Sequence, residues 1–161
     1  MLKLKYYSQD RTYTCGPTCL KMVFEFFGKK IREGKLVKLT KTKKSGTSHR
    51  NMIKVSRRHG FYCYVHNDAS LNQVRHFIDL KLPVIVNFTE PDGNEGHYAV
   101  VIGYKHGKII MNDPWNGKNF KMNSSEFKRR WYDYHKHHKY TNWLLVLSRK
   151  QFNIGKQYFP L

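Results

Sequence analysis

The stretch Gln9–Leu20, which reads QDRTYTCGPTCL, carries the residues on which both the fold and the site predictions depend. Residues up to Thr14 are mostly polar, and from Cys15 onward apolar side chains recur every three or four positions. This pattern predicts a helix over Cys15–Phe27 that Thr14 can cap and Gly28 can end. Cys15 then stands at a helix N-terminus, where the positive end of the helix dipole favours a thiolate.

Two later stretches supply partners for such a thiol. His97 opens the apolar run Gly96–Ile102 (GHYAVVI), so its imidazole lies at a strand entrance, which suits a general base. Asp113 follows the apolar run Lys108–Met111 in a neighbouring strand, where its carboxylate could accept the ring proton of His97. Each of these residues alone has an ordinary interpretation as a loop or turn residue. Together they indicate a cysteine nucleophile with a base and an orienting acid.

Gln9 adds a fourth candidate. Its side-chain amide could donate to the oxyanion that develops when a thiolate attacks a carbonyl, beside the backbone N–H of Cys15. By itself Gln9 would be an ordinary loop glutamine. The predicted site therefore consists of Cys15, His97, Asp113 and Gln9.

The other cysteines and histidines have structural interpretations. Cys19 lies one helical turn after Cys15 and is expected to be a small buried apolar residue, and Cys63 is expected in the core of a strand. Three cysteines form neither a disulfide framework nor a zinc spacing, so a reducing, cytoplasmic compartment fits best. His135–His138 is expected to be a basic, solvated stretch. No metal or organic cofactor is implied.

Length and composition favour a single domain over 1–161. The chain has 161 residues, of which 40% are hydrophobic, and this is enough for one core. Its longest apolar runs, Leu82–Phe88 and Tyr98–Ile102, are too short to span a bilayer, and the N-terminus has no continuous hydrophobic signal core. We therefore expect a soluble protein that is not secreted by the ordinary route.

The charge is unusual. Lys and Arg number 30 against 11 acidic residues, which gives a formal net charge of +19. Such a surface could attract a polyanion such as nucleic acid or an anionic membrane, or it could simply be solvated. No nucleic-acid motif accompanies the charge, so polyanion binding is a secondary hypothesis.

The predicted order of elements is α+β, with a helical N-terminal half packed on an antiparallel β-sheet formed by the C-terminal half. Leu2–Tyr7 is expected to be a short strand or an extended arm, and Lys30–Lys44 a short helix or an irregular segment. The predicted helices after the first are His49–His59, Leu71–Leu80 and Ser124–Tyr134. The predicted strands are Phe61–His66, Pro83–Phe88, Tyr98–Tyr104, Lys108–Met111 and Asn142–Leu147.

These motifs form a familiar combination across nearly the whole chain. They comprise Gln9 with Cys15–Met22, Phe26–Gly28, Gly46–Ser48, Gly60–Phe61, Leu82–Ile85, Gly96–Val101 and Asp113–Gly117. The combination resembles the papain-like cysteine peptidase domain that removes double-glycine leaders from bacteriocin precursors. The resemblance implies a papain-like α+β fold. It also implies that Cys15 is the nucleophile, His97 the base, Asp113 the orienting acid and Gln9 the oxyanion donor.

The resemblance extends to the substrate. It implies a peptide or protein substrate, in which a peptide or isopeptide bond is cut after glycine. Among the many aromatic residues, Tyr13, Trp115 and Trp131 are candidate walls of a narrow groove for such a substrate. The resemblance also places Ser125–Phe127 and Trp131 near the substrate side.

In that family the domain usually precedes an exporter, whereas here no membrane span or nucleotide-binding cassette follows, so a stand-alone member is expected. Two alternatives stay open. One is an acyl-transferring enzyme or amidase with the same triad, and the other is a basic polyanion-binding protein on an inactive papain-like scaffold.

Overall fold

A computed structural model describes all residues from 1 to 161, and it contains five helices and nine strands. The helices are α1 (Cys15–Phe26), α2 (Glu33–Leu39), α3 (His49–Arg58), α4 (Leu71–Asp79) and α5 (Ser124–Arg130). The strands are β1 (Tyr62–His66), β2 (Val84–Thr89), β3 (Gly96–Lys105), β4 (Lys108–Asp113), β5 (Gly117–Asn123), β6 (Tyr132–His135), β7 (His138–Thr141), β8 (Leu144–Ser148) and β9 (Gln157–Tyr158). None of the helices is long and apolar enough to cross a membrane.

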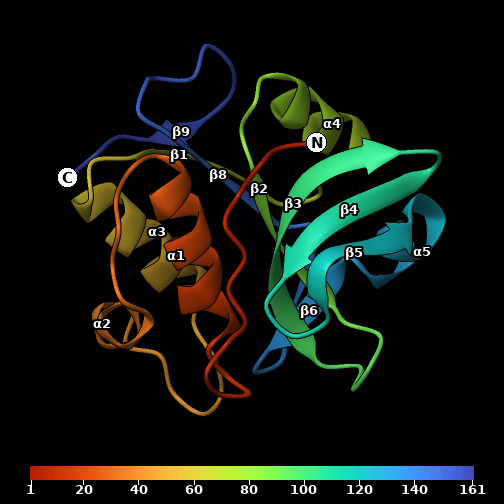
Figure 1. The fold of residues 1–161 in the computed structure, drawn as a ribbon, viewed down its shortest axis with the longest axis horizontal. Helices are drawn as coiled ribbons and strands as arrows, with labels where there is room; N and C mark the ends of the chain where they lie inside the picture. Colours follow the sequence, from red (N-terminus) through yellow and green to blue (C-terminus); the bar gives the residue numbers. More distant parts are fainter.

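The main sheet has seven antiparallel strands in the order β5-β4-β3-β2-β8-β1-β9, and β6 and β7 form a separate hairpin. The central strands β2, β3, β4 and β8 are almost entirely buried, as their apolar sequences predict. Figure 1 shows α1, α2 and α3 gathered beside one end of the sheet, and β3, β4 and β5 at the other end. The predicted α+β, papain-like arrangement is confirmed.

The N-terminal arm connects these two parts. Residues 1–9 form no strand, but Leu2 N–H donates to the Ile102 carbonyl at 2.7 Å, and Tyr6 Oη donates to the Asp113 carbonyl at 2.9 Å. Further along, Gln9 N–H donates to the Pro114 carbonyl at 3.1 Å. In Figure 1 this arm passes between α1 and the strands. It therefore brings the loop that begins at Gln9 to the end of β4.

The helix that carries Cys15 is fixed by burial rather than by a side-chain cap. Leu20, Val23 and Phe24 on α1 are fully buried, and Phe24 stacks on Phe61 with ring centroids 5.0 Å apart. The Thr14 hydroxyl bonds to the backbone of Arg11 instead of capping the helix. The expected Thr14 side-chain cap was therefore wrong, because the hydroxyl closes the preceding turn.

Several elements in the last third of the chain differ from the expectation. The predicted helix Ser124–Tyr134 ends at Arg130, because Trp131 turns inward and donates its Nε1–H to the Trp143 carbonyl at 3.0 Å. The aromatic segment after it pairs as β6 with β7. Strand β5 was not predicted, since its sequence GKNFKMN is polar and only Met122 is buried. An edge strand of this kind carries little hydrophobic periodicity.

Candidate active site

The first component of the site is the thiol of Cys15, at the first residue of α1. The side chain is buried, with only 8% of the residue exposed, and its Sγ accepts a hydrogen bond from Tyr98 N–H at 3.5 Å. Tyr98 lies on β3, so this contact joins the helical part of the molecule to the sheet. Cys15 and Gly16 begin the helix, so their N–H groups have no acceptor within it.

The second component is a buried pair on β3 and β4. His97 Nε2 and Asp113 Oδ1 are 2.6 Å apart, and both side chains are almost inaccessible to solvent. His97 precedes Tyr98, whose N–H contacts the thiol, so Cys15 and the imidazole are neighbours. Since Nε2 faces the carboxylate, the other ring nitrogen is the one available to the thiol. The structure thus brings Cys15, His97 and Asp113 together.

Asp113 is the last residue of β4 rather than a residue beyond the strand. Its Oδ1 also accepts the N–H groups of Trp115 and Asn116 at 2.9 and 3.0 Å, and its Oδ2 accepts from Asn116 Nδ2 at 3.1 Å. A bulge between Met111 and Asp113 in the pairing of β4 with β5 accompanies this turn. The tight turn therefore fixes the carboxylate toward His97.

The protonation of this pair follows from its surroundings. Burial alone would lower the pKa of His97, but the negative charge of Cys15, the hydrogen bonds to Asp113 and Cys15, and the charge of Asp113 raise that pKa to about 10. Burial would raise the pKa of Asp113, yet its bonds to His97 and Asn116 hold the pKa below the ordinary value. The raised pKa of His97 and the lowered pKa of Asp113 both describe an imidazolium paired with a carboxylate.

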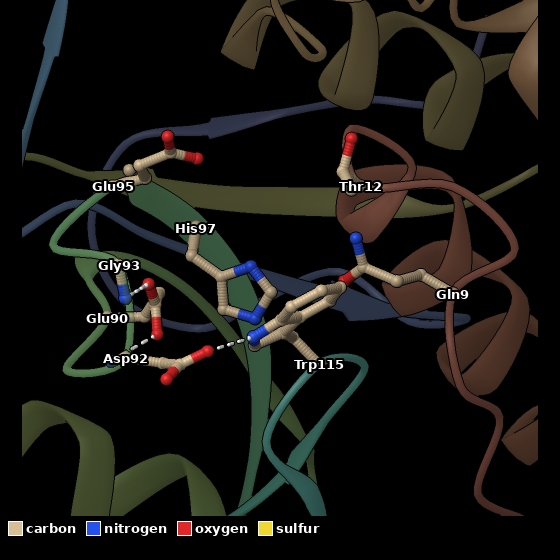
Figure 2. Close-up of a pocket in the computed structure, with 9 residues that line it drawn as sticks. Gln9, Thr12, Glu90, Asp92, Gly93, Glu95, His97 and Trp115 are labelled. Atoms are coloured by element: carbon tan, nitrogen blue, oxygen red, sulfur yellow. Dashed lines mark hydrogen bonds between the residues drawn. The ribbon is translucent and has the colours of Figure 1, made fainter.

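Gln9 lies at the same site, but its side-chain amide is already engaged in a hydrogen bond to the backbone. Its Nε2 donates to the Arg11 carbonyl at 2.7 Å, and its Oε1 is buried without a hydrogen-bond partner. Figure 2 shows this oxygen on the side of Trp115 and His97, with the nitrogen directed toward Thr12. Only the second N–H of Nε2 is available for an oxyanion, and the role of Gln9 stays a prediction.

Asn87 was not predicted as part of the site. Its Nδ2 donates to the His97 carbonyl at 3.2 Å and to Asp133 Oδ2 at 3.0 Å, while its Oδ1 lies 2.7 Å from Nε2 of His49. Asn87 thereby supports the backbone of His97 from β2, next to a second, partly buried histidine. A single polar residue inside the apolar run Val84–Phe88 was the available signal.

Glu33 is a second residue that the sequence did not single out. Its carboxylate accepts the Thr18 hydroxyl and, at 3.1 Å, the Asp10 N–H, so it links α2 to α1 and to the loop beside Gln9. Burial is the main reason that the pKa of Glu33 is raised. The loop of Gln9 is therefore anchored from both sides, by Pro114 and by Glu33.

The other cysteines match their expected roles. Cys19 and Cys63 are fully buried. Burial raises the pKa of Cys19 well above its usual value and that of Cys63 to about 12. A thiol held neutral in this way is a poor nucleophile. Cys15 differs from both, because its sulfur contacts the backbone of Tyr98, the residue next to His97.

The predicted groove walls are only partly present. Trp115 is half exposed and lines a cavity with His97, as expected. Trp131 was expected as a groove wall, which was wrong, because it is buried in the core and packs on Phe127 with ring centroids 5.0 Å apart. The placement of Ser125–Phe127 near the substrate side stays a prediction. Tyr13 is partly exposed and lines none of the main cavities.

A thiol on a helix N-terminus beside a buried histidine–aspartate pair on neighbouring strands is the arrangement of a papain-like cysteine peptidase. The sequence profile of the peptidase C39 family matches residues 3–135. The chain belongs to the peptidase C39 family, and it is a cysteine peptidase.

Relatives known from sequence are large transport proteins. The chain is 30% identical over 132 residues to the mesentericin-Y105 transport/processing ATP-binding protein MesD of Leuconostoc mesenteroides, covering 80% of this chain and 18% of the relative. It is 30% identical over 131 residues to the transport/processing ATP-binding protein ComA of Streptococcus pneumoniae, with 80% of this chain and 18% of the relative covered. The chain thus spans about a fifth of the length of these relatives.

Solved structures show the same fold. The peptidase domain of Streptococcus ComA superposes with a TM-score of 0.74 at 24% identity, over 93% of this chain and 100% of that domain. A C39-like peptidase from Bacillus anthracis gives a TM-score of 0.73 at 13% identity, over 92% and 96% of the two chains. A double glycine motif protease from an AMS/PCAT transporter, solved with a leader peptide, gives a TM-score of 0.71 at 21% identity. The match covers 90% of this chain and 91% of that chain.

Proposed function

We propose that this peptidase cleaves a peptide bond after a double glycine, with Cys15 as nucleophile, His97 as acid–base, Asp113 as the orienting acid and Gln9 as an oxyanion donor. The observation that carries these roles is the His97–Asp113 contact of 2.6 Å placed beside the Cys15 sulfur. The preference for glycine is supported by the similar fold of a double glycine motif protease that was solved in complex with a leader peptide.

The resting state in this proposal is a Cys15 thiolate next to a His97 imidazolium. The thiolate sulfur attacks the carbonyl carbon of the scissile bond, and the carbonyl oxygen becomes an oxyanion that the Cys15 N–H and the Gln9 amide stabilise. When the oxyanion collapses, the C–N bond breaks and the His97 proton goes to the leaving nitrogen. A thioester remains on Cys15, and His97 is neutral.

Water completes the cycle. Neutral His97 takes a proton from water, and the resulting hydroxide attacks the thioester carbonyl. The C–S bond then breaks, which releases a peptide with a free carboxylate and restores the thiolate and imidazolium. Asp113 stays ionised throughout and fixes the ring orientation.

The backbone on either side of the proposed catalytic pair is tightly packed. A Cβ added to Gly16, the residue after the nucleophile, would come within 3.0 to 3.1 Å of side-chain atoms of Thr47 and Met52. The Tyr98 hydroxyl donates to the Thr47 carbonyl at 2.7 Å and closes the same corner. Asp133 fills the space where a side chain on Gly96 would lie, directly before His97. Gly16 and Gly96 therefore allow the backbone beside Cys15 and His97 to pack closely against these side chains.

The first experiment separates an active site from an inactive scaffold. With limiting iodoacetamide at neutral pH, intact-mass analysis should detect one adduct, on Cys15, while buried Cys19 and Cys63 stay unmodified. His97→Ala should slow this labelling to the rate of a free thiol. Labelling of wild type no faster than a free thiol would favour the polyanion-binding alternative.

The second experiment tests the reaction. A peptide with an internal Gly-Gly should be cut after the second glycine to give a free carboxylate, and Cys15→Ala should abolish this cleavage. Gln9→Ala should lower kcat by about 10²–10³, the range seen when one oxyanion donor is removed. Equal cleavage by Cys15→Ala would refute the proposal, and capture of the acyl group by an added amine in preference to water would favour acyl transfer.

A further inference from the structure

A cavity of about 170 Å³ lies next to the His97 side of the site. The loop between β2 and β3 forms one wall and the turn after β4 forms the other, as Figure 2 shows. Residues whose side chains or backbone line it include Gln9, Glu90, Asp92, Glu95, His97 and Trp115. Cys15 does not line it, so the cavity extends from the imidazole away from the thiol.

The charge of this cavity is opposite to that of the protein. Glu90, Asp92 and Glu95 are three of only 11 acidic residues in a chain with 30 Lys and Arg. None of the three carboxylates lies within 4.0 Å of a Lys, Arg or His nitrogen. In a concave wall, such uncompensated charges concentrate a negative potential.

The three carboxylates differ in their bonds. Glu90 is buried and accepts the N–H groups of Asp92 and Gly93 at 2.7 and 2.6 Å, so it organises the loop. Asp92 accepts the Trp115 Nε1–H at 2.9 Å, as the dashed line in Figure 2 marks. The Glu95 carboxylate accepts no hydrogen bond, although it lines the cavity. Glu95 is therefore the acid most available to a ligand.

A second, independent feature, at Gln9, points to a ligand that carries hydrogen-bond donors. Gln9 lines the same cavity, and its Oε1 atom is buried and has no hydrogen-bond partner in the protein. An unpartnered buried acceptor is costly, so it favours a ligand that brings an N–H group. Lysine and arginine side chains carry both N–H donors and a positive charge.

The proposed reaction determines which part of a substrate lies next to this cavity. His97 gives its proton to the leaving nitrogen, so the chain that follows the scissile bond must lie against the imidazole. The cavity lies on that side. We propose that it binds a lysine or arginine side chain from the first two residues after the scissile bond. This inference rests on the proposed function.

The test compares two peptides that share a Gly-Gly sequence and differ in the next two residues, Lys-Lys or Glu-Glu. Wild type should have a higher kcat/KM for the lysine peptide. In Glu95→Gln the ratio of the two kcat/KM values should fall about threefold, and in the Asp92→Asn, Glu95→Gln double variant it should fall further. Asp68→Asn removes an exposed carboxylate outside this cavity and should keep the wild-type ratio.

A charge reversal sharpens the test. Glu95→Lys should shift the ratio toward the glutamate peptide, and added salt should reduce the preference of wild type. A ratio near one in wild type, or the same ratio in wild type and Glu95→Gln, would overturn the inference while leaving the peptidase reaction intact. A preference for lysine before the glycines instead of after them would also overturn it. Failure of wild type to cut any Gly-Gly peptide would refute the proposed function itself.

Discussion

Two histidines, the buried His97 and the partly buried His49, contact the Asn87 side chain and have opposite electrostatic environments. His97 faces the carboxylate of Asp113, and its pKa is raised to about 10, even though burial opposes the charge. His49 faces the carboxamide of Asn87 and stacks on Trp143 with ring centroids 4.0 Å apart, and burial lowers its pKa to about 4. An ionised partner therefore decides whether a buried imidazole carries a proton.

The two histidines also affect stability in opposite pH ranges. A pKa raised in the folded state gives stability that is present below the unfolded value near 6.5 and is lost as the pH rises through about 10, which applies to His97. A lowered pKa gives stability that is present above 6.5 and is lost as the pH falls toward about 4, which applies to His49. The site thus keeps its charged pair across neutral pH.

The largest effect should come from giving His97 a neutral partner like that of His49. Asp113→Asn retains a side chain of the same size but removes the charge that stabilises the imidazolium, so kcat on a Gly-Gly peptide should fall by about 10³–10⁴. Steady-state kinetics at pH 7 measure this, with a thermal unfolding curve to verify folding. A loss of less than tenfold would mean that the His97–Asp113 contact does not orient the base.

A smaller effect is expected from removing the residue between the two histidines. Asn87→Ala leaves the Asp133 carboxylate, the His49 ring and the His97 carbonyl each without one hydrogen bond, so the free energy of unfolding should fall by about 2–3 kcal/mol. Urea denaturation measures it. The exposed Asn72→Ala on α4 should change stability by no more than about 0.5 kcal/mol. Equal effects of the two substitutions would show that the Asn87 bonds contribute nothing.

The smallest effect concerns His49 in mild acid. Between pH 7 and pH 5 the unfolded chain protonates this histidine while the folded protein does not, so wild type should lose roughly 1.5–2 kcal/mol more stability than His49→Gln. Urea denaturation at both pH values gives the difference. His137→Gln, at an exposed position, should follow the wild-type slope. Parallel slopes for wild type and His49→Gln would contradict the lowered pKa.

The local patterns of the sequence were sufficient for much of the fold. The apolar spacing from Cys15 to Phe27 predicted α1, the predicted helix Leu71–Leu80 corresponds to α4, and the short apolar runs predicted β2, β3, β4 and β8. These local patterns did not predict β5, and they placed the end of α5 too late in the chain. There the chain is mostly polar or is turned by the burial of Trp131, which is a tertiary contact.

The sequence also determined which residue types were available at the site. It identified the thiol at a helix start, and it identified a histidine and an aspartate on two consecutive strands that were expected to pair as a hairpin. The structure pairs these strands antiparallel, with Val100 opposite Asn112.

Only the tertiary structure decided how these groups interact. The 2.6 Å contact of His97 with Asp113, the support from Asn87 and the bonds of Gln9 depend on segments far apart in the chain. The same is true of the acidic cavity, because residues near Gln9, Glu90 and Trp115 meet only after folding. Distance, burial and charge fix protonation and specificity, and residue spacing along the chain does not specify them.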